Sequence, residues 1–116
     1  LDEVTIFYDE ALFGQVWQNL ISNAIKFTDK DGIINIMLKK YDDEAILTIR
    51  DNGIGMSDEV KSHIFEKFYQ GDASRAREGN GLGLALVKKI LDNSHCRIDV
   101  ESKEGVGTAF TVHIPI

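Results

Sequence analysis

Apolar residues recur at helical spacing from Glu10 to about Phe27 and predict a long amphipathic helix over this segment. The helix is expected to be capped by Asp9, and the residues Val4 to Tyr8 before it predict a short strand. Its apolar positions are Leu12, Val16, Leu20 and Ala24, with Trp17 and Ile21 beside them. The chain is therefore expected to open with a strand followed by a helix.

The middle of the chain changes to the alternating pattern of strands. Ile33 to Tyr41 and Glu44 to Arg50 predict a strand pair around a tight connection at Asp42-Asp43. Farther on, Ser57 is expected to cap a short helix from Asp58 to about Ile64.

The last part begins with a segment from Gln70 to Asn80 that has little to bury and predicts a mobile loop. A second long helix is expected from Leu82 to about Asn93, followed by strands over Arg97 to Ser102 and Thr108 to Ile114. Strands here follow one another instead of alternating strictly with helices. This order predicts an α+β sandwich with a mixed sheet covered on one face by helices.

The composition limits the function. The 116 residues are 43% hydrophobic and 28% charged, which suits one globular domain over residues 1–116. A net charge of −6 argues against nucleic acid as a partner. The single cysteine, Cys96, favours a reducing compartment, and no membrane span or signal-peptide pattern is present, so a cytoplasmic domain that is not membrane-inserted is expected. A chain that begins at Leu1 is expected to come from a longer protein, and a membrane segment elsewhere in that parent stays open.

Three polar side chains share one stripe of the first helix. Asn19, Asn23 and Lys26 have the spacing of neighbours on a helical surface. One interpretation is a solvated polar face. The other is a site in which an amide oxygen ligates a hard cation such as Mg²⁺ while Lys26 offers charge to a phosphate.

A carboxylate ends the core-facing row of the third predicted strand. Ala45, Leu47, Ile49 and Asp51 fall on one face by alternation, and a buried Asp51 needs a donor such as the exocyclic amine of a purine. The alternative is a hairpin turn at Asp51-Asn52-Gly53. The following residues lead into a capped helix, so a pocket wall is preferred, with Gly53 and Gly55 leaving room for a flat ligand.

The glycine run from Gly79 to Gly83 leads directly into the second helix and suits phosphate binding. Its spacing matches neither the P-loop nor the G-x-G-x-x-G loops of dinucleotide-binding proteins and ordinary protein kinases. Two arginines, Arg75 and Arg77, precede it and are either solvated loop charges or phosphate ligands.

These segments together resemble the GHKL superfamily of ATP-binding domains, and most closely the catalytic domain of sensor histidine kinases. Asn19 to Thr28 resembles the N box, Asp51 to Gly55 the G1 box, Phe65 to Phe68 the F box, Gly79 to Gly83 the G2 box, and Gly105 to Phe110 the closing Gly-Thr segment. The resemblance covers nearly the whole chain, with the motifs in the family's order. It implies a two-layer sandwich of the Bergerat type, in which ATP lies between the helices and a flexible lid.

The resemblance also implies roles for individual residues. Asp51 would accept a hydrogen bond from the adenine amine with support from Thr108, and Asn23 would be the Mg²⁺ ligand. Asn19 and Lys26 would assist at the phosphates, so Asn19, Asn23 and Lys26 are the candidate catalytic residues. The candidate nucleotide-binding residues are Asn23, Lys26, Phe27, Asp51, Gly53, Gly55, Arg77, Gly79, Gly81, Leu82, Gly83 and Thr108.

Asn19 separates the kinases from relatives that hydrolyse ATP, because those relatives have a glutamate base at this position. An amide is a poor base, which fits an acceptor that is itself a nucleophile, such as histidine imidazole. None of His63, His95 and His113 lies in the His-Glu or His-Asp context of the family's acceptor, and His113 is expected to be structural.

The resemblance therefore implies partners outside this chain. They are a dimerisation and histidine-phosphotransfer domain of the same parent and a downstream response regulator, while the isolated domain is expected to be monomeric. Phe65 and Phe68 either dock on that domain or belong to the core. The rival hypothesis is a degenerate module of the same superfamily that acts through nucleotide or protein binding without kinase activity.

Overall fold

The computed structural model describes residues 10–28, 31–66 and 83–116. The elements are, in chain order, α1 (Glu10–Lys26), β1 (Ile34–Lys40), β2 (Glu44–Asp51), α2 (Asp58–His63), α4 (Gly83–Asn93), β3 (Arg97–Lys103) and β4 (Gly107–Pro115). Each was expected from the sequence, with small differences in the bounds. The predicted strand at Val4 to Tyr8 and the predicted loop at Gln70 to Asn80 lie outside the described residues. Within the described residues, no helix has both the length and the apolar character needed to cross a membrane.

The strands form one sheet in the order β1-β2-β4-β3. Every pairing among these described strands is antiparallel, so the parallel pairing that a mixed sheet requires is not found among them. The last strand of the chain, β4, lies between β2 and β3. This arrangement brings the end of β2 beside the start of β4.

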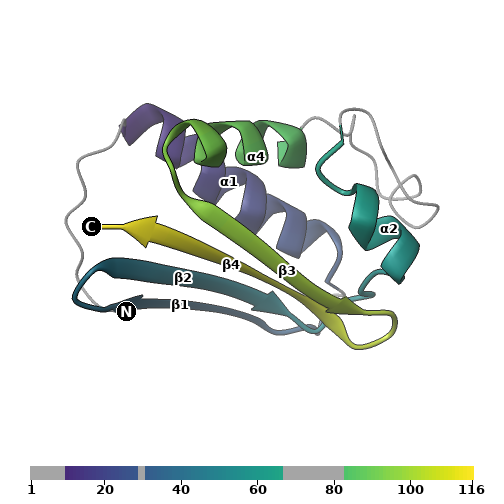
Figure 1. Cartoon of the computed structure of the whole chain (residues 1–116). Coiled ribbons are helices and arrows are strands. Elements are labelled where there is room, and N and C mark those ends of the chain that lie inside the picture. Colours follow the sequence, from purple (N-terminus) through teal and green to yellow (C-terminus); the bar gives the residue numbers. More distant parts are fainter. Residues whose placement is uncertain (1–9, 29–30, 67–82) are drawn as a thin grey trace.

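The molecule has two layers, with α1 and α4 side by side on one face of the sheet (Figure 1). Side chains from both helices and from the inner face of the sheet form one core, in which Leu20, Val87 and Val112 are fully buried. The other core residues include Phe13, Val16, Ala24, Ala45, Leu47, Ile49, Ile90, Leu91, Ile98, Phe110 and Ile114. The predicted sandwich with helices on one face is confirmed.

The turn from α4 into β3 is closed without glycine. His95 adopts a left-handed conformation with φ of 61°. The N–H of Cys96 donates to the carbonyl of Leu91 at 2.9 Å and the N–H of His95 to that of Asp92 at 3.2 Å, which is the hydrogen-bond pattern of a Schellman motif. The helix therefore ends here and the chain enters β3 at Arg97.

The predicted cap of the short helix is also present. Ser57 has extended backbone geometry, and its Oγ accepts from the N–H of Val60 at 3.2 Å. Asp58 and Glu59 follow in the first turn, where negative charge is favourable. The chain after Asp51 thus proceeds to α2, which excludes the alternative of a hairpin at the end of β2.

Candidate functional site

The end of β2 holds a buried carboxylate beside a buried hydroxyl. Asp51 is 7% exposed and Thr108 8%, and the two are cross-strand partners of β2 and β4. In β2 the buried positions are Ala45, Leu47, Ile49 and Asp51. The alternation predicted from the sequence is therefore confirmed, and Asp51 lies at the end of the row that faces the helices.

Hydrogen bonding compensates only part of the cost of burying Asp51. Burial raises the pKa of this carboxyl above its ordinary value, while hydrogen bonds from the backbone N–H groups of Gly53 and Thr108 lower it. The bond from Gly53 to Oδ1 of Asp51 is 2.9 Å long. A carboxyl group kept in place against a net desolvation cost is typical of functional sites.

The residues from Asp51 to Met56, which we call the G1 segment, are held from two sides by backbone contacts. On one side the N–H of Ile54 donates to the carbonyl of Phe27, just beyond α1, at 3.1 Å. On the other side the N–H of Gly105, in the turn between β3 and β4, donates to the carbonyl of Ile54 at 2.8 Å. The segment that follows the buried Asp51 is therefore clamped between the end of α1 and the β3–β4 turn.

Glycine is required at three points of this clamp. A Cβ on Gly53 would lie 1.9 Å from the carbonyl oxygen of Phe27. One on Gly55, where φ is 67°, would lie 2.0 Å from the carbonyl oxygen of Lys103. One on Gly107 would lie 2.1 Å from the carbonyl oxygen that ends β2. Close approach of backbone to backbone therefore requires glycine at positions 53 and 55, a reason that differs from the predicted room for a flat ligand, which stays a prediction.

Asn19, the first residue of the polar stripe of α1, lies beside the start of α4. The Nδ2 of Asn19 donates to the carbonyl of Gln15 at 2.8 Å, and its Oδ1 would lie 3.1 Å from a Cβ built on Gly83. Asn23 and Lys26, farther along the stripe, are half-buried. The structure therefore brings Asn19 to the last glycine of the predicted phosphate-binding run.

Two other predicted residues lie at the end of α1. The Nζ of Lys26 lies 5.9 Å from the centre of the Phe27 ring, within the range of a cation–π contact. Phe27 also supplies the carbonyl that receives the G1 segment. The remaining candidate residues, Arg77, Gly79, Gly81 and Leu82, lie outside the described residues, as does Arg75.

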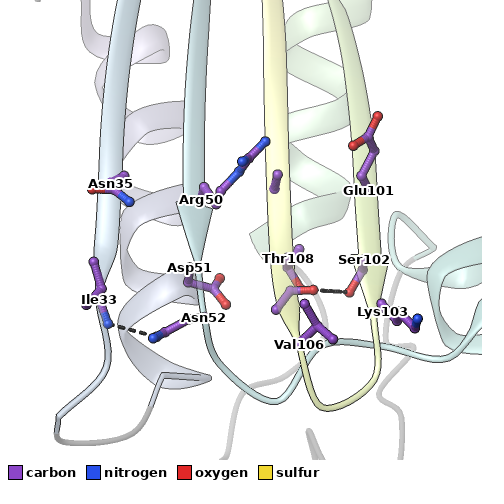
Figure 2. A pocket seen from close by; sticks show the side chains of 12 residues that line it. Ile33, Asn35, Arg50, Asp51, Asn52, Glu101, Ser102, Lys103, Val106 and Thr108 are labelled. Carbon is purple, nitrogen blue, oxygen red and sulfur yellow. Dashed lines mark hydrogen bonds between the residues drawn. The ribbon is translucent and has the colours of Figure 1, made fainter.

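A hollow of about 540 Å³ lies at the end of the sheet that carries Asp51 and Thr108 (Figure 2). Asn35, Arg50, Ala109 and Glu101 line it and are consecutive cross-strand partners, so they share one face. Arg50 alternates with Asp51 along β2 and points to the opposite side. These residues lie on the open face of the sheet, away from the helices, but Asp51, Ser102 and Thr108 also line the hollow, so it reaches the predicted base-binding end of the sheet.

His113 also lies on the open face and has a structural role, as expected. Its Nδ1 is 3.2 Å from Oε1 of Glu44 and its Nε2 is 3.2 Å from Oδ2 of Asp99. Arg97 contacts the same Nε2 at 3.1 Å. These contacts link β2, β4 and β3 across the sheet.

Phe65 belongs to the core. Its ring meets that of Phe110 edge-on, with the ring centres 6.5 Å apart, and the preceding Ile64 is buried. Phe65 is half-buried and packs against the core, and docking on another domain stays a prediction. Phe68 lies outside the described residues.

Ser102 is a residue of the site that was not among the candidates predicted from the sequence. This serine accepts a hydrogen bond from the N–H of Met56 at 2.8 Å, and its Oγ lies 2.8 Å from Oγ1 of Thr108. The signal was available, because Ile98, Val100 and Ser102 alternate along β3 just as the buried row of β2 does. In both β2 and β3, the alternating positions that are buried or half-buried end in a polar residue, Asp51 and Ser102, and these two residues indicate where the site lies.

Comparison with known proteins identifies the family. Residues 8–116 match the model of the histidine kinase-, DNA gyrase B- and HSP90-like ATPases. The chain belongs to this family. It is an ATP-binding domain of the kind found in two-component sensor histidine kinases.

Individual relatives agree with this assignment. The chain is 39% identical over 112 residues to the heme sensor protein HssS of Staphylococcus saprophyticus, with 97% of the chain and 24% of that protein covered. It is 38% identical over 116 residues to the sensor histidine kinase RppB of Synechocystis, with 98% and 26% covered. The chain thus spans about a quarter of the length of these relatives.

Solved structures of sensor kinases share the fold. A mycobacterial sensor histidine kinase, MprB, superimposes with a TM-score of 0.86 at 28% identity, covering 95% of this chain and 76% of that one. Full-length ShkA in complex with AMPPNP has a TM-score of 0.82 at 30% identity, covering 96% and 23%. The fold of the ATP-binding domain is therefore shared in detail.

The clamp on the G1 segment predicts that two glycine-to-alanine variants differ strongly in their free energy of unfolding. Gly53→Ala should lower the free energy of unfolding by about 3 kcal/mol or more, because its Cβ collides with backbone that cannot rotate away. Gly14→Ala in α1, where nothing lies within 4 Å of the added Cβ, should raise it by about 1 kcal/mol. Urea denaturation of both variants measures the difference, and similar stabilities would contradict the clamp.

The burial of Asp51 predicts that the difference in stability between the wild type and Asp51→Asn depends on pH in the nucleotide-free protein. Because its pKa is raised in the folded state, the contribution of Asp51 to stability is fully present below the ordinary value of 3.8 and is lost as the pH rises through the raised pKa. Asn at this position does not titrate. Asp51→Asn should therefore gain stability relative to the wild type between acid and neutral pH. A constant difference in unfolding free energy from pH 3 to pH 7 would show that burial does not penalise this carboxylate.

Proposed function

We propose that this domain binds Mg²⁺-ATP on the helix-covered face of the sheet and donates the γ-phosphoryl group to a histidine elsewhere in its parent protein. The observation that carries the proposal is the pair formed by Asp51 and Thr108. A carboxylate buried at a net cost, next to a buried hydroxyl, suits recognition of a base that offers a hydrogen-bond donor.

The residues at the other end of the proposed site suit a metal and phosphates. Asn23 offers an amide oxygen, a hard ligand that Mg²⁺ accepts, and Lys26 on the same stripe offers positive charge. Mg²⁺ in such sites takes few protein ligands and the rest from phosphates and water. When bound, Mg²⁺ would neutralise charge that develops on the phosphates.

Asn19 supports transfer to a strong nucleophile rather than to water. Its Nδ2 is engaged with the carbonyl of Gln15, and an amide at this position supplies no base to activate water. None of the three described histidines is followed by Glu or Asp as the family's acceptor is, and His113 contacts Glu44 and Asp99 on the open face. We therefore place the acceptor on a dimerisation domain of the parent, with a response regulator downstream.

The names of the relatives support the kinase proposal over the rival, a degenerate binding module. HssS and RppB are named as sensor proteins, the latter as a sensor histidine kinase. The intact Asn23 and Asp51 also favour nucleotide binding.

Calorimetric titration with Mg²⁺-ATP tests the proposal. The wild-type domain should bind, and Asp51→Asn should reduce affinity at least tenfold because a neutral amide replaces the acceptor of the adenine amine by a weaker one, a change of about 1.5–3 kcal/mol for a charged hydrogen bond. Asp99→Asn, on the open face of β3, is the matched control and should bind as the wild type does. A wild-type domain that binds no Mg²⁺-ATP would rule out the kinase, and an unchanged affinity of Asp51→Asn would place the base elsewhere.

A further inference from the structure

The hydroxyl of Ser102 connects the G1 segment to Thr108. Ser102 lies at the end of β3 as the cross-strand partner of Thr108. Its Oγ receives the N–H of Met56 at 2.8 Å and lies 3.0 Å from the carbonyl oxygen of Gly107 and 2.8 Å from Oγ1 of Thr108 (Figure 2). One side chain therefore contacts three backbone or side-chain groups around the proposed base-binding pair.

The number of protons decides the direction of these bonds. A serine hydroxyl donates once and accepts twice. One of its lone pairs is taken by the N–H of Met56, and the carbonyl of Gly107 can only accept, so Ser102 donates to Gly107. The remaining lone pair of Ser102 then receives the hydroxyl proton of Thr108. This is the arrangement in which all three contacts of Ser102 are hydrogen bonds.

We propose that Ser102 is a positioning residue that makes Thr108 a hydrogen-bond acceptor toward the ligand and so selects bases with an exocyclic amine. This proposal rests on the proposed function, because it concerns the base of the bound nucleotide. With its proton engaged by Ser102, Thr108 has only lone pairs left to offer. The ionised Asp51 beside it is also an acceptor only.

Such a pair distinguishes adenine from hypoxanthine. Adenine has an amine at the position where hypoxanthine has a carbonyl oxygen. The amine can donate to Asp51 directly and to Thr108 directly or through water, whereas the carbonyl meets acceptors alone. A buried polar group left without a partner is penalised more than a satisfied one is rewarded.

The test compares the dissociation constants of Mg²⁺-ATP and Mg²⁺-ITP, measured by calorimetry, for the wild type and Ser102→Ala. Removing the Ser102 oxygen frees the Thr108 proton, which can then donate to a carbonyl. The ratio of the ITP to the ATP dissociation constant should fall about fivefold or more, which is the effect expected from one ordinary hydrogen bond. Thr111→Ala, a half-buried position of β4 on the open face, is the control and should keep the wild-type ratio.

Conservative variants of Ser102 show whether it orients the Thr108 hydroxyl or only stabilises the surrounding structure. Ser102→Thr keeps the hydroxyl and should keep the wild-type ratio, whereas Ser102→Cys, with a weak donor and acceptor, should lose part of it. If Ser102→Ala does not fold, these two variants still show whether Ser102 affects the preference for ATP over ITP.

Equal weakening of ATP and ITP by Ser102→Ala or Ser102→Cys would overturn the proposal and leave Ser102 a purely structural role. A ratio that falls in Ser102→Thr as much as in Ser102→Cys would overturn it as well. Failure of the wild-type domain to bind either nucleotide would instead overturn the proposed function.

Discussion

The close approach of the G1 segment to two other pieces of backbone is the constraint on which the site depends. Residues after Asp51 pass so near to Phe27 and Lys103 that only glycine fits at positions 53 and 55. Hydrogen bonds from Ile54 to Phe27 and from Gly105 to Ile54 hold this approach in place. The end of α1, the end of β2 and the β3–β4 turn, which are far apart in sequence, thereby meet at one point.

This clamp explains how a costly group is kept in position. An ionised Asp51 at 7% exposure is unfavourable in the absence of a ligand, and burial raises its pKa. The surrounding backbone cannot relax to expose it, because its neighbours are fixed by the contacts on both sides. The domain thus gives up some stability to keep Asp51 in the proposed base-binding position, an exchange typical of functional sites.

Patterns that depend on neighbouring residues could be predicted from the sequence. The periodicity of α1, the buried row of β2 ending in Asp51 and the Ser57 cap all hold in the structure. The strand order and the contacts of Gly53 arise from residues distant in sequence, which no local pattern encodes. Ser102 lies between these cases: its alternation was visible, but its bonds to Met56 and Thr108 emerge only when the sheet is assembled.

Native-state hydrogen exchange tests most directly the central claim that the clamp holds the G1 segment as firmly as the sheet holds its strands. The amides of Ile54, Met56 and Gly105, which make the hydrogen bonds of the clamp, can be compared with those that join β2 to β4. The structure predicts that in the nucleotide-free domain the clamp amides exchange about as slowly as the strand amides, through the same global unfolding. Fast exchange of the clamp amides that becomes slow only on addition of Mg²⁺-ATP would contradict the account.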